Sequence, residues 1–465
     1  MTGHGTRSAL MRLNTDTFLI PFQDRRIIYR PRRRLAFIGN EALADYLASR
    51  AAAIESRNGE IEQFLEAVGY DLPGLVCPPV EIPPDGFRPA AAVLLMTNRC
   101  NLRCVYCYAN AGDEPHAAEM SWPIAKALID YVQANAQRTD GEIPSLTFHG
   151  GGEPAVCWDL MRRCVEYAHD RNPDTHVSMS SNGVWTGSQR EFICRNFQSV
   201  SLSMDGTPGV QNEQRPLFGG GESSPAVMES IHALDACGMD YGIRMTVLPG
   251  SVDQLVAGVE FICENSRART IQIEPTFTSV RGQYADVPAA FADAFIGRFM
   301  EAWRIGKAFG RQVYYSGARP WVIAPMFCQA PLKAAVAAAD GRLVTCFEVF
   351  SESSPFAGSF TVGRVSDAKV EFDHASLQAY LDKQQQRRRE CEGCFCYWHC
   401  CGDCATRRPD MLQKDSGRCR VTRGVTRELL LEYMEEGDGV WQGLLAAPPG
   451  AADCDYAVVG DSGDV

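Results

Sequence analysis

The sequence lacks a membrane-spanning run, a secretory signal and an excess of basic residues. It contains no run of about 18 apolar residues, the length that a membrane-spanning helix needs, so we expect no membrane partner. Its first 22 residues lack the sustained apolar segment of a secretory signal. It has no basic excess, because 45 Lys and Arg stand against 57 Asp and Glu, which argues against a nucleic-acid partner. These absences predict a cytoplasmic location.

Cysteine, by contrast, is abundant, with 19 residues in a chain of 465. This share is too small for the disulfide scaffold of a short secreted domain, and the odd count excludes complete pairing. In a reducing cytoplasm, clustered cysteines are more often metal ligands than disulfides. The cysteine clusters therefore direct the search for function.

Residues 1–85 are expected to form a small α+β unit of their own. Short strand candidates are followed by two segments with helical spacing, and a Pro-rich joint at 77–86 ends the unit. The strand candidates are 18–22, 26–31 and 34–39, and the helical segments are 41–53 and 59–69.

Residues 90–310 alternate short apolar strands with longer helical stretches, which predicts an α/β fold with a parallel sheet. Six such units are expected to form an open partial (β/α)6 barrel, with site residues at the C-terminal ends of the strands. The strand candidates are 93–97, 146–150, 176–181, 199–204, 242–247 and 270–275.

The rest of the chain divides into a cysteine-rich part and a tail. Residues 311–425 carry nine cysteines with weak periodicity and are expected to form a C-terminal iron–sulfur domain. A helix is expected near 425–436. Residues 437–465 are rich in Gly, Ala, Pro and Asp, and we predict that they are disordered.

The first cysteine group, Cys100, Cys104 and Cys107, has the spacing C-x3-C-x2-C directly after the first strand of the α/β part. Iron–sulfur clusters normally take four cysteine ligands, so three leave one iron open to a small molecule. The alternative is a structural zinc site or a disulfide loop, but structural zinc takes four protein ligands.

This array resembles the signature of the radical S-adenosylmethionine (SAM) enzymes. The resemblance implies a [4Fe–4S] cluster whose open iron chelates SAM, and an external reductant such as flavodoxin or ferredoxin. It also implies cleavage of SAM to a 5′-deoxyadenosyl radical that takes hydrogen from a substrate, so that the protein mainly binds and orients.

Further motifs follow in the order that this family has. The run at 149–154 ends the second strand and is similar to the family's GGEP motif. By this resemblance Gly151 and Gly152 let the backbone approach the methionyl end of SAM, and Glu153 meets its ammonium group. A glycine run taken alone is more often only a turn.

Five more residues resemble the family's SAM contacts. Ser180 and Asn182 end the third strand and Ser203 ends the fourth, where the family contacts the ribose. Arg215 is expected to pair with the methionyl carboxylate, because a guanidinium fork suits that group, or to form a surface salt bridge. Tyr106 matches an aromatic residue that packs near adenine.

The second cysteine group resembles the seven-cysteine SPASM extension of radical SAM enzymes, which holds two auxiliary clusters. The resemblance implies three [4Fe–4S] clusters in all. A distal cluster would be held by Cys391, Cys394, Cys400 and Cys419, and a proximal one by Cys328, Cys346 and Cys404.

The proximal set is one ligand short of four. Its fourth iron is therefore open, or it borrows a ligand such as Cys396 or Cys401. Zinc knuckles are the alternative for this whole region. The remaining cysteines are interpreted as buried small hydrophobic residues: Cys77, Cys157, Cys164, Cys194, Cys237, Cys263 and Cys454.

SPASM enzymes commonly modify peptides, so the hypothesis is a maturase that takes hydrogen from a ribosomally made precursor peptide and installs a thioether or carbon–carbon crosslink or a related modification such as epimerisation. The order of strands and helices in 1–85 is similar to winged-helix domains in which a leader peptide extends a sheet edge. A basic run is expected to attract an acidic leader. It comprises Arg25, Arg26, Arg30, Arg32, Arg33 and Arg34. The alternative for this unit is a solvated hairpin that caps the barrel.

Two other functions remain open. A formylglycine-forming enzyme of the anaerobic sulfatase type carries an aspartate directly after the cysteine that matches Cys346, but this chain has Phe347 there. Glu348 follows and is a weak catalytic candidate, since a strand would turn it to the face opposite Phe347. A non-catalytic zinc-binding regulator is the alternative of another class.

Overall fold

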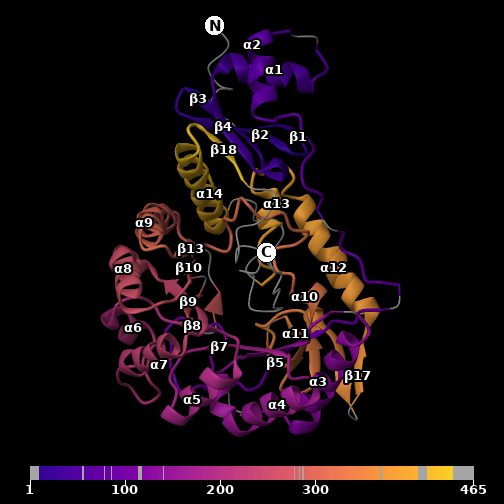
Figure 1. The fold of residues 1–465 in the computed structure, drawn as a ribbon, viewed down its shortest axis with the longest axis vertical. Coiled ribbons are helices and arrows are strands. Elements are labelled where there is room, and N and C mark those ends of the chain that lie inside the picture. Colours follow the sequence, from indigo (N-terminus) through magenta and orange to yellow (C-terminus); the bar gives the residue numbers. More distant parts are fainter. Residues whose placement is uncertain are drawn as a thin grey trace.

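Two β-sheets organise the chain in the computed structural model (Figure 1). The structure describes residues 10–54, 57–77, 79–84, 86–113, 118–139, 141–276, 278–281, 283–284, 287–354, 356–366, 369–406 and 416–443. Within these ranges no helix has the length and apolar character required to cross a membrane.

The larger sheet has eleven strands, and its parallel part confirms the predicted α/β class. Six parallel strands neighbour one another in chain order, and β13 and β14 flank them as further parallel strands. Their bounds are β5 Ala91–Leu95, β6 Ser145–His149, β7 His176–Ser181, β8 Ser199–Ser203, β9 Asp240–Val247, β10 Thr270–Pro275, β13 Gln312–Tyr314 and β14 Ala334–Ala338. All five residues of β5 are buried, as expected for a parallel strand covered on both faces.

Helices between these strands cover the outer side of the sheet (Figure 1). They are α3 Trp122–Ala136, α4 Trp158–Arg171, α5 Gly187–Asn196, α6 Pro208–Gln214, α7 Ser224–Cys237, α8 Leu255–Asn265 and α9 Ala289–Ala308, with short 3₁₀ turns η2 Pro154–Cys157 and η3 Pro249–Gln254. A small hairpin, β11 Thr278–Val280 and β12 Gln283–Tyr284, follows β10.

The C-terminal part continues the same sheet. Beyond β14, the antiparallel strands β15, β16 and β17 complete it. The elements are β15 Arg342–Val344, β16 Thr361–Ser366, β17 Lys369–Phe372, α10 Ala330–Lys333, α11 Ala357–Phe360, α12 His374–Arg389, α13 Tyr397–Cys400 and α14 Gly417–Glu436. The two predicted regions 90–310 and 311–425 therefore share one sheet.

The smaller sheet is antiparallel, in the order β1-β2-β3-β4-β18. Its elements are β1 Met11–Asn14, β2 Thr17–Phe22, β3 Arg25–Arg30, η1 Pro31–Arg33, β4 Leu35–Gly39 and β18 Val440–Gln442, with helices α1 Glu41–Ala51 and α2 Gly59–Ala67. β18 pairs with β4 and comes from the segment 437–465 that we predicted to be disordered. That prediction is wrong for these three residues, and residues 444–465 lie outside the described part.

The two faces of the smaller sheet pack against different parts of the chain. Alternate side chains of a strand point to opposite faces, so Leu19 of β2 contacts the cluster of α1 and α2, whereas Phe18 faces the other way. On that second face Phe18 packs in one cluster with Phe395 and Leu430 of the C-terminal part. The N-terminal unit is thus joined to the cysteine-rich region by its core.

We expect Trp441→Ala to lower the free energy of unfolding by about 2 kcal/mol, because the half-buried indole of β18 stacks on the ring of Tyr433 at 5.5 Å. Chemical denaturation of the full chain measures the change. Phe309→Ala is the matched control, because this ring is 44% exposed at the end of α9 and its loss should change stability by less than about 0.5 kcal/mol. Equal effects of the two substitutions would contradict a stabilising role for β18.

Candidate active site

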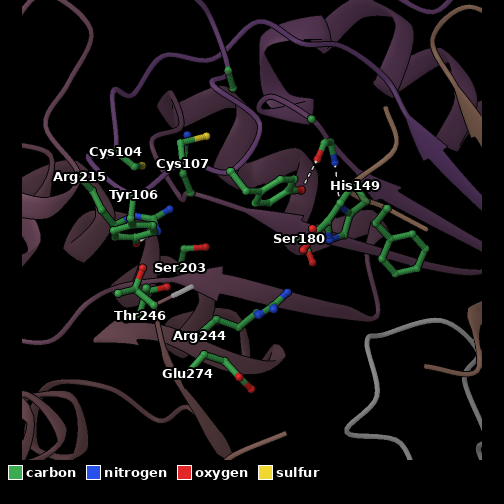
Figure 2. A pocket seen from close by; sticks show the side chains of 18 of the residues that line it. Cys104, Tyr106, Cys107, His149, Ser180, Ser203, Arg215, Arg244, Thr246 and Glu274 are labelled. Atoms are coloured by element: carbon green, nitrogen blue, oxygen red, sulfur yellow. Dashed lines mark hydrogen bonds between the residues drawn. The ribbon is translucent and has the colours of Figure 1, made fainter. Parts of the chain in front are cut away.

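A cavity of about 280 Å³ brings the ends of the parallel strands together with the C-terminal part. Figure 2 shows Cys104 and Cys107 on one side of it, and Ser203, Arg244 and Glu274 across from them. Thirteen of the residues predicted as site residues line it: Cys100, Cys104, Tyr106, Cys107, Gly151, Gly152, Glu153, Ser180, Asn182, Ser203, Arg215, Glu348 and Cys404.

The first cysteine group forms a tight loop directly after β5. The backbone N–H of Cys107 donates to the carbonyl of Cys104 at 3.2 Å, and the backbone N–H of Leu102 points at Cys100 Sγ at 3.5 Å. Burial raises the pKa of Cys100 to about 12 and that of Cys104 to about 11, so both thiols keep their protons until a metal replaces them. Three thiols on one cavity, with the Leu102 N–H aimed at one sulfur, fit a cluster that has three protein ligands.

Arg281 stabilises this loop through contacts with its backbone. This role of Arg281 was not predicted from the sequence. Its guanidinium donates to the carbonyl of Cys104 at 2.7 Å and to the carbonyl of Ala111 at 2.9 Å. It also forms an ion pair with Asp113 at 2.9 Å. No sequence motif indicated this contact, because Arg281 follows β10 by several residues and reaches the loop only through the fold.

Glu153 is a buried acceptor that holds the strand ends together. Its carboxylate accepts from Ser181 Oγ at 2.7 Å, from the backbone N–H of Asn182 at 2.8 Å and from that of Ala155 at 3.2 Å. Burial raises the pKa of this carboxyl, and the hydrogen bonds offset part of that shift. The predicted ammonium contact of Glu153 would be an additional partner for these oxygens.

Packing within the chain already requires glycine at positions 151 and 152. A Cβ on Gly152 would lie 1.9 Å from the carbonyl oxygen of Arg99, and a Cβ on Gly151 would lie 2.2 Å from the ring of Phe350. Neither distance is tolerable for real atoms. The expected approach of this backbone to SAM therefore comes in addition to close contacts within the chain.

Tyr106 and Arg215 belong to one buried polar network. Tyr106 donates its hydroxyl hydrogen to Asp205 at 2.6 Å, and Arg215 donates to the Tyr106 oxygen at 2.5 Å. Asp205 also accepts from the backbone N–H of Thr246 at 3.0 Å. Arg215 is only 8% exposed, so the alternative of a surface salt bridge is wrong. Asp205, which directly follows a predicted strand end, was missed.

Strands β9 and β10 add three polar residues to the cavity that we had not predicted, namely Arg244, Thr246 and Glu274. Glu274 accepts from Gln272 Nε2 at 2.9 Å and from the backbone N–H of Ser316 at 3.0 Å. Thr246 and Glu274 are the next-to-last residues of predicted strands, and the expected barrel was the signal that could have found them. Arg244 lies in the middle of a predicted strand and carried no such signal.

The segment that follows β15 packs directly on the glycine run. The ring of Phe347 packs against His149 in a tilted arrangement, with centroids 4.9 Å apart. Burial, followed by the charge of Arg244, lowers the pKa of His149 to about 4, so this ring is neutral at pH 7. The backbone N–H of Gly150 donates to His149 Nδ1 at 3.0 Å. This packing joins the C-terminal part to the strand ends.

Phe347 and Glu348 both line the cavity, which corrects the expectation that they face opposite ways. That expectation assumed a strand, but the backbone turns here, and the N–H of Val349 donates to the carbonyl of Cys346 at 3.1 Å. A turn does not alternate its side chains, so the catalytic candidate Glu348 faces the same space as the first cysteine group.

The predicted proximal set lies on the side of the C-terminal part that borders the cavity. Cys404 lines the cavity, and Cys328 and Cys404 both pack against the small cluster of Ala324, Phe327 and Cys401. Burial raises the pKa of Cys346 well above its ordinary value, and the nearby Glu348, Cys404 and Cys328 raise it further. Cys401, one of the two suggested borrowed ligands, is thus close to this set.

The predicted distal set lines a second pocket, toward the smaller sheet. Its four cysteines all lie there, and Cys396 lies with them rather than with the proximal set. The four are Cys391, Cys394, Cys400 and Cys419. Two further residues connect the two sites, because Asp403 lines the second pocket and Arg418 lines the cavity.

Asp403 and Arg418 form a buried two-pronged ion pair with distances of 2.5 and 2.7 Å. Burial alone raises the pKa of Asp403, but Arg418 outweighs it and lowers that pKa below its ordinary value. Asp403 directly precedes Cys404 and Arg418 directly precedes Cys419. The pair therefore fixes one predicted ligand of each auxiliary cluster relative to the other.

The zinc alternative predicts ligands that converge on one ion. Structural zinc takes four ligands, with sulfur about 2.3 Å from the metal. In the part of the chain that the structure describes, no three His, Cys, Asp or Glu residues are arranged to hold a single ion. Thiols around a four-iron cluster lie farther apart, because each binds a different iron.

Three of the remaining cysteines confirm the interpretation as buried residues, and three do not. Cys157, Cys164 and Cys263 are buried in the main core. Cys237 is exposed, and Cys194 and Cys77 are half-buried, so the interpretation is wrong for these three. Cys77 lies beside Arg388, and Cys454 lies outside the described residues.

We expect Arg281→Ala to lower the free energy of unfolding by about 2 kcal/mol, because two carbonyls of the cysteine loop lose a charged donor. Chemical denaturation measures the change, and the iron bound per chain after anaerobic reconstitution should fall with it. Arg269→Ala is the control, because its ion pair with Asp240 is exposed and is worth under about 1 kcal/mol. Unchanged stability and iron content in Arg281→Ala would contradict the role given to this side chain.

Known proteins share this sequence and fold in part. The Radical SAM superfamily matches residues 94–261. The sporulation killing factor maturation protein SkfB of Bacillus subtilis is 28% identical over 186 residues, which cover 40% of this chain and 42% of SkfB. An Fe-coproporphyrin III synthase of Methanosarcina barkeri is 30% identical over 178 residues, 37% of this chain and 41% of that protein. The chain thus spans about two fifths of the length of either relative.

The structure extends the likeness of fold beyond the matched segment. It is similar to anSMEcpe with bound AdoMet, with a TM-score of 0.58 and 16% identity, over 75% of this chain and 99% of that one. At this identity the similarity concerns the fold alone. The three-cysteine loop after β5 lies within residues 94–261, and this part of the chain is a radical SAM domain.

Proposed function

We propose that this chain is a radical SAM/SPASM maturase that takes hydrogen from a ribosomally made precursor peptide and installs a thioether or carbon–carbon crosslink. The observation that carries the proposal is the shared cavity. Cys100, Cys104 and Cys107 line it from the strand ends, and Glu348 and Cys404 line it from the C-terminal part. A substrate bound there contacts both predicted cysteine sites at once.

Each group of residues that lines the cavity has a role in this proposal. Cys100, Cys104 and Cys107 would hold a [4Fe–4S] cluster that supplies radical chemistry with SAM, and the remaining set would hold two auxiliary clusters for electron transfer. Tyr106, Asp205 and Arg215 form a fixed polar wall, and Glu153 presents buried carboxylate oxygens to an ammonium group. The neutral ring of His149 and the ring of Phe347 exclude water between the two halves of the site.

Glu348 is the base that we assign in this proposal. Its carboxylate lies on the cavity and beside the proximal cysteines, where it accepts the proton that a substrate thiol or amide releases as a crosslink closes. The same position keeps formylglycine formation as the alternative, because that reaction also needs a base next to the residue that matches Cys346.

A peptide substrate is supported by SkfB and by one of the solved structures of similar fold. SkfB is named a maturation protein of a killing factor, and anSMEcpe has been seen with a bound Cp18Cys peptide. A leader peptide would add to β1, because β18 already occupies the edge of β4, and β1 pairs only with β2 among the described strands. The basic run contributes less than expected, since Arg26 and Arg34 are buried and Arg30 pairs with Asp16 at 3.2 Å.

Anaerobic reconstitution tests the class of protein. We expect about 12 iron atoms and a similar amount of sulfide per chain, because three four-iron clusters fill the predicted ligands. We also expect reductive cleavage of SAM to 5′-deoxyadenosine, measured by liquid chromatography. A colourless protein with stoichiometric zinc and no SAM cleavage would support the zinc-binding regulator instead.

Glu348→Gln tests the base. The variant should still cleave SAM, since the first cysteine group is unchanged, but the modified peptide should form about 100-fold more slowly. Mass spectrometry of a co-expressed candidate peptide, read as the loss of two hydrogens, measures product. Glu352→Gln is the control, because this exposed carboxylate lies four residues further along and does not line the cavity.

The same assay also tests a tetrapyrrole substrate, because four relatives are named as enzymes of heme synthesis, one of them an Fe-coproporphyrin III synthase. Turnover of an iron coproporphyrin with no change in any peptide would contradict the peptide proposal. Equal product from Glu348→Gln and from the unsubstituted chain would remove Glu348 from the mechanism while leaving the substrate class intact.

A further inference from the structure

Two cysteines outside all the predicted cluster sites meet on the outer helical layer. Cys194 belongs to α5 and Cys237 is the last residue of α7, two helices that pack side by side (Figure 1). Their sulfur atoms are 2.6 Å apart. This separation is shorter than a packing contact between sulfurs and approaches the bond length of about 2.05 Å in a disulfide.

The surrounding contacts hold both thiols in the seam between the helices. Cys194 Sγ points at the carbonyl of Ala233 at 3.5 Å, and Cys237 Sγ points at the carbonyl of Leu234 at 3.4 Å. A salt bridge between Arg190 of α5 and Glu229 of α7, at 3.0 Å, joins the same two helices. The sulfurs are therefore neighbours because the helices are fixed by other contacts.

The two thiols differ in their access to solvent. Cys237 is exposed, whereas Cys194 is half-buried. Burial and the hydrogen bond with Cys237 raise the pKa of Cys194 to about 12. A disulfide reagent from solvent therefore contacts Cys237 first. The sulfur of Cys194 lies beneath it, close enough to form a bond. This order is typical of an exposed cysteine with a resolving partner.

We propose that Cys194 and Cys237 form a reversible dithiol–disulfide site that responds to low-molecular-weight disulfides. Cys237 attacks a disulfide RSSR as its thiolate, which forms a mixed disulfide and releases one RS⁻. Cys194 then attacks the Cys237 sulfur, loses its proton and releases the second RS⁻. The protein loses two electrons and two protons, and RSSR takes them up as two RSH. A dithiol reductant reverses both steps.

The Cys194–Cys237 disulfide would enclose a segment of the chain that contributes residues to the cavity wall. Residues between Cys194 and Cys237 include β8 with Ser203, the network residue Asp205, and Arg215. Closing a covalent loop around this segment restricts its unfolded states and so stabilises it. The proposal requires no cluster, no SAM and no peptide, so it stands or falls independently of the proposed function.

Peptide mass spectrometry of the full-length, anaerobically reconstituted protein tests the proposal. The protein is incubated with glutathione disulfide as the probe, alkylated, denatured and digested. We expect more than half of the chains to carry one peptide pair joined through Cys194 and Cys237, about 2 Da lighter than the sum of the two reduced peptides. Dithiothreitol should remove the link, and the unfolding temperature should be higher with the link than after its reduction.

Two variants make the order of the steps visible. Cys194→Ser should leave a glutathione adduct on Cys237 that persists, because the resolving thiol is gone. Cys237→Ser should lose the link and slow the reaction of Cys194 with the probe at least tenfold. Cys263 is the internal control, since it is buried in the same domain and should remain unmodified in the folded protein.

Separate alkylation of Cys194 and Cys237 in the unsubstituted chain after exposure to the probe would overturn the proposal. Glutathione adducts on both residues without a link would overturn it too, because they would show that the two sulfurs do not meet. Both results are read from the unsubstituted protein, so the test does not depend on whether the variants fold.

Discussion

The packing of Phe347 and Phe350 on the glycine run makes one site out of two cysteine groups. Phe347 packs against His149, and Phe350 fills the space that a side chain at Gly151 would need. A larger residue at Gly151 would push the C-terminal segment away and open the cavity to solvent. Without this contact the three-cysteine loop and Cys404 would belong to separate surfaces.

Other parts of the fold keep that contact in place. β14 pairs along its whole length with β5, so the C-terminal part continues the sheet that bears the first cysteine loop. The buried pair of Asp403 and Arg418 ties the proximal and distal loops together. On the far side, β18 pairs with β4 and anchors the N-terminal sheet to the chain that follows α14. These contacts connect the segments that carry the predicted ligands to both sheets.

Sequence patterns predicted the parts of this site that depend on local spacing. The cysteine arrays and the strand ends were found because ligand spacing and the period of a strand are properties of short segments. The turn from Cys346 to Val349 was not predicted, because nothing in the sequence of that stretch distinguishes a turn from a strand. Three contacts were also not predicted: that of Arg281 with the Cys104 carbonyl, the pairing of Val440–Gln442 with β4, and the contact between Cys194 and Cys237. Each of these joins residues far apart in the chain, and only the packed fold brings them together.

The central claim is that one cavity is served by a radical-generating cysteine group and by an auxiliary one. Diffraction from crystals of the anaerobically reconstituted protein, recorded at the iron absorption edge, tests it most directly. The account predicts three separate iron peaks, one at Cys100, Cys104 and Cys107, one at Cys328, Cys346 and Cys404, and one among the four distal cysteines. Iron at the first group alone, or zinc in place of iron at the C-terminal cysteines, would contradict it.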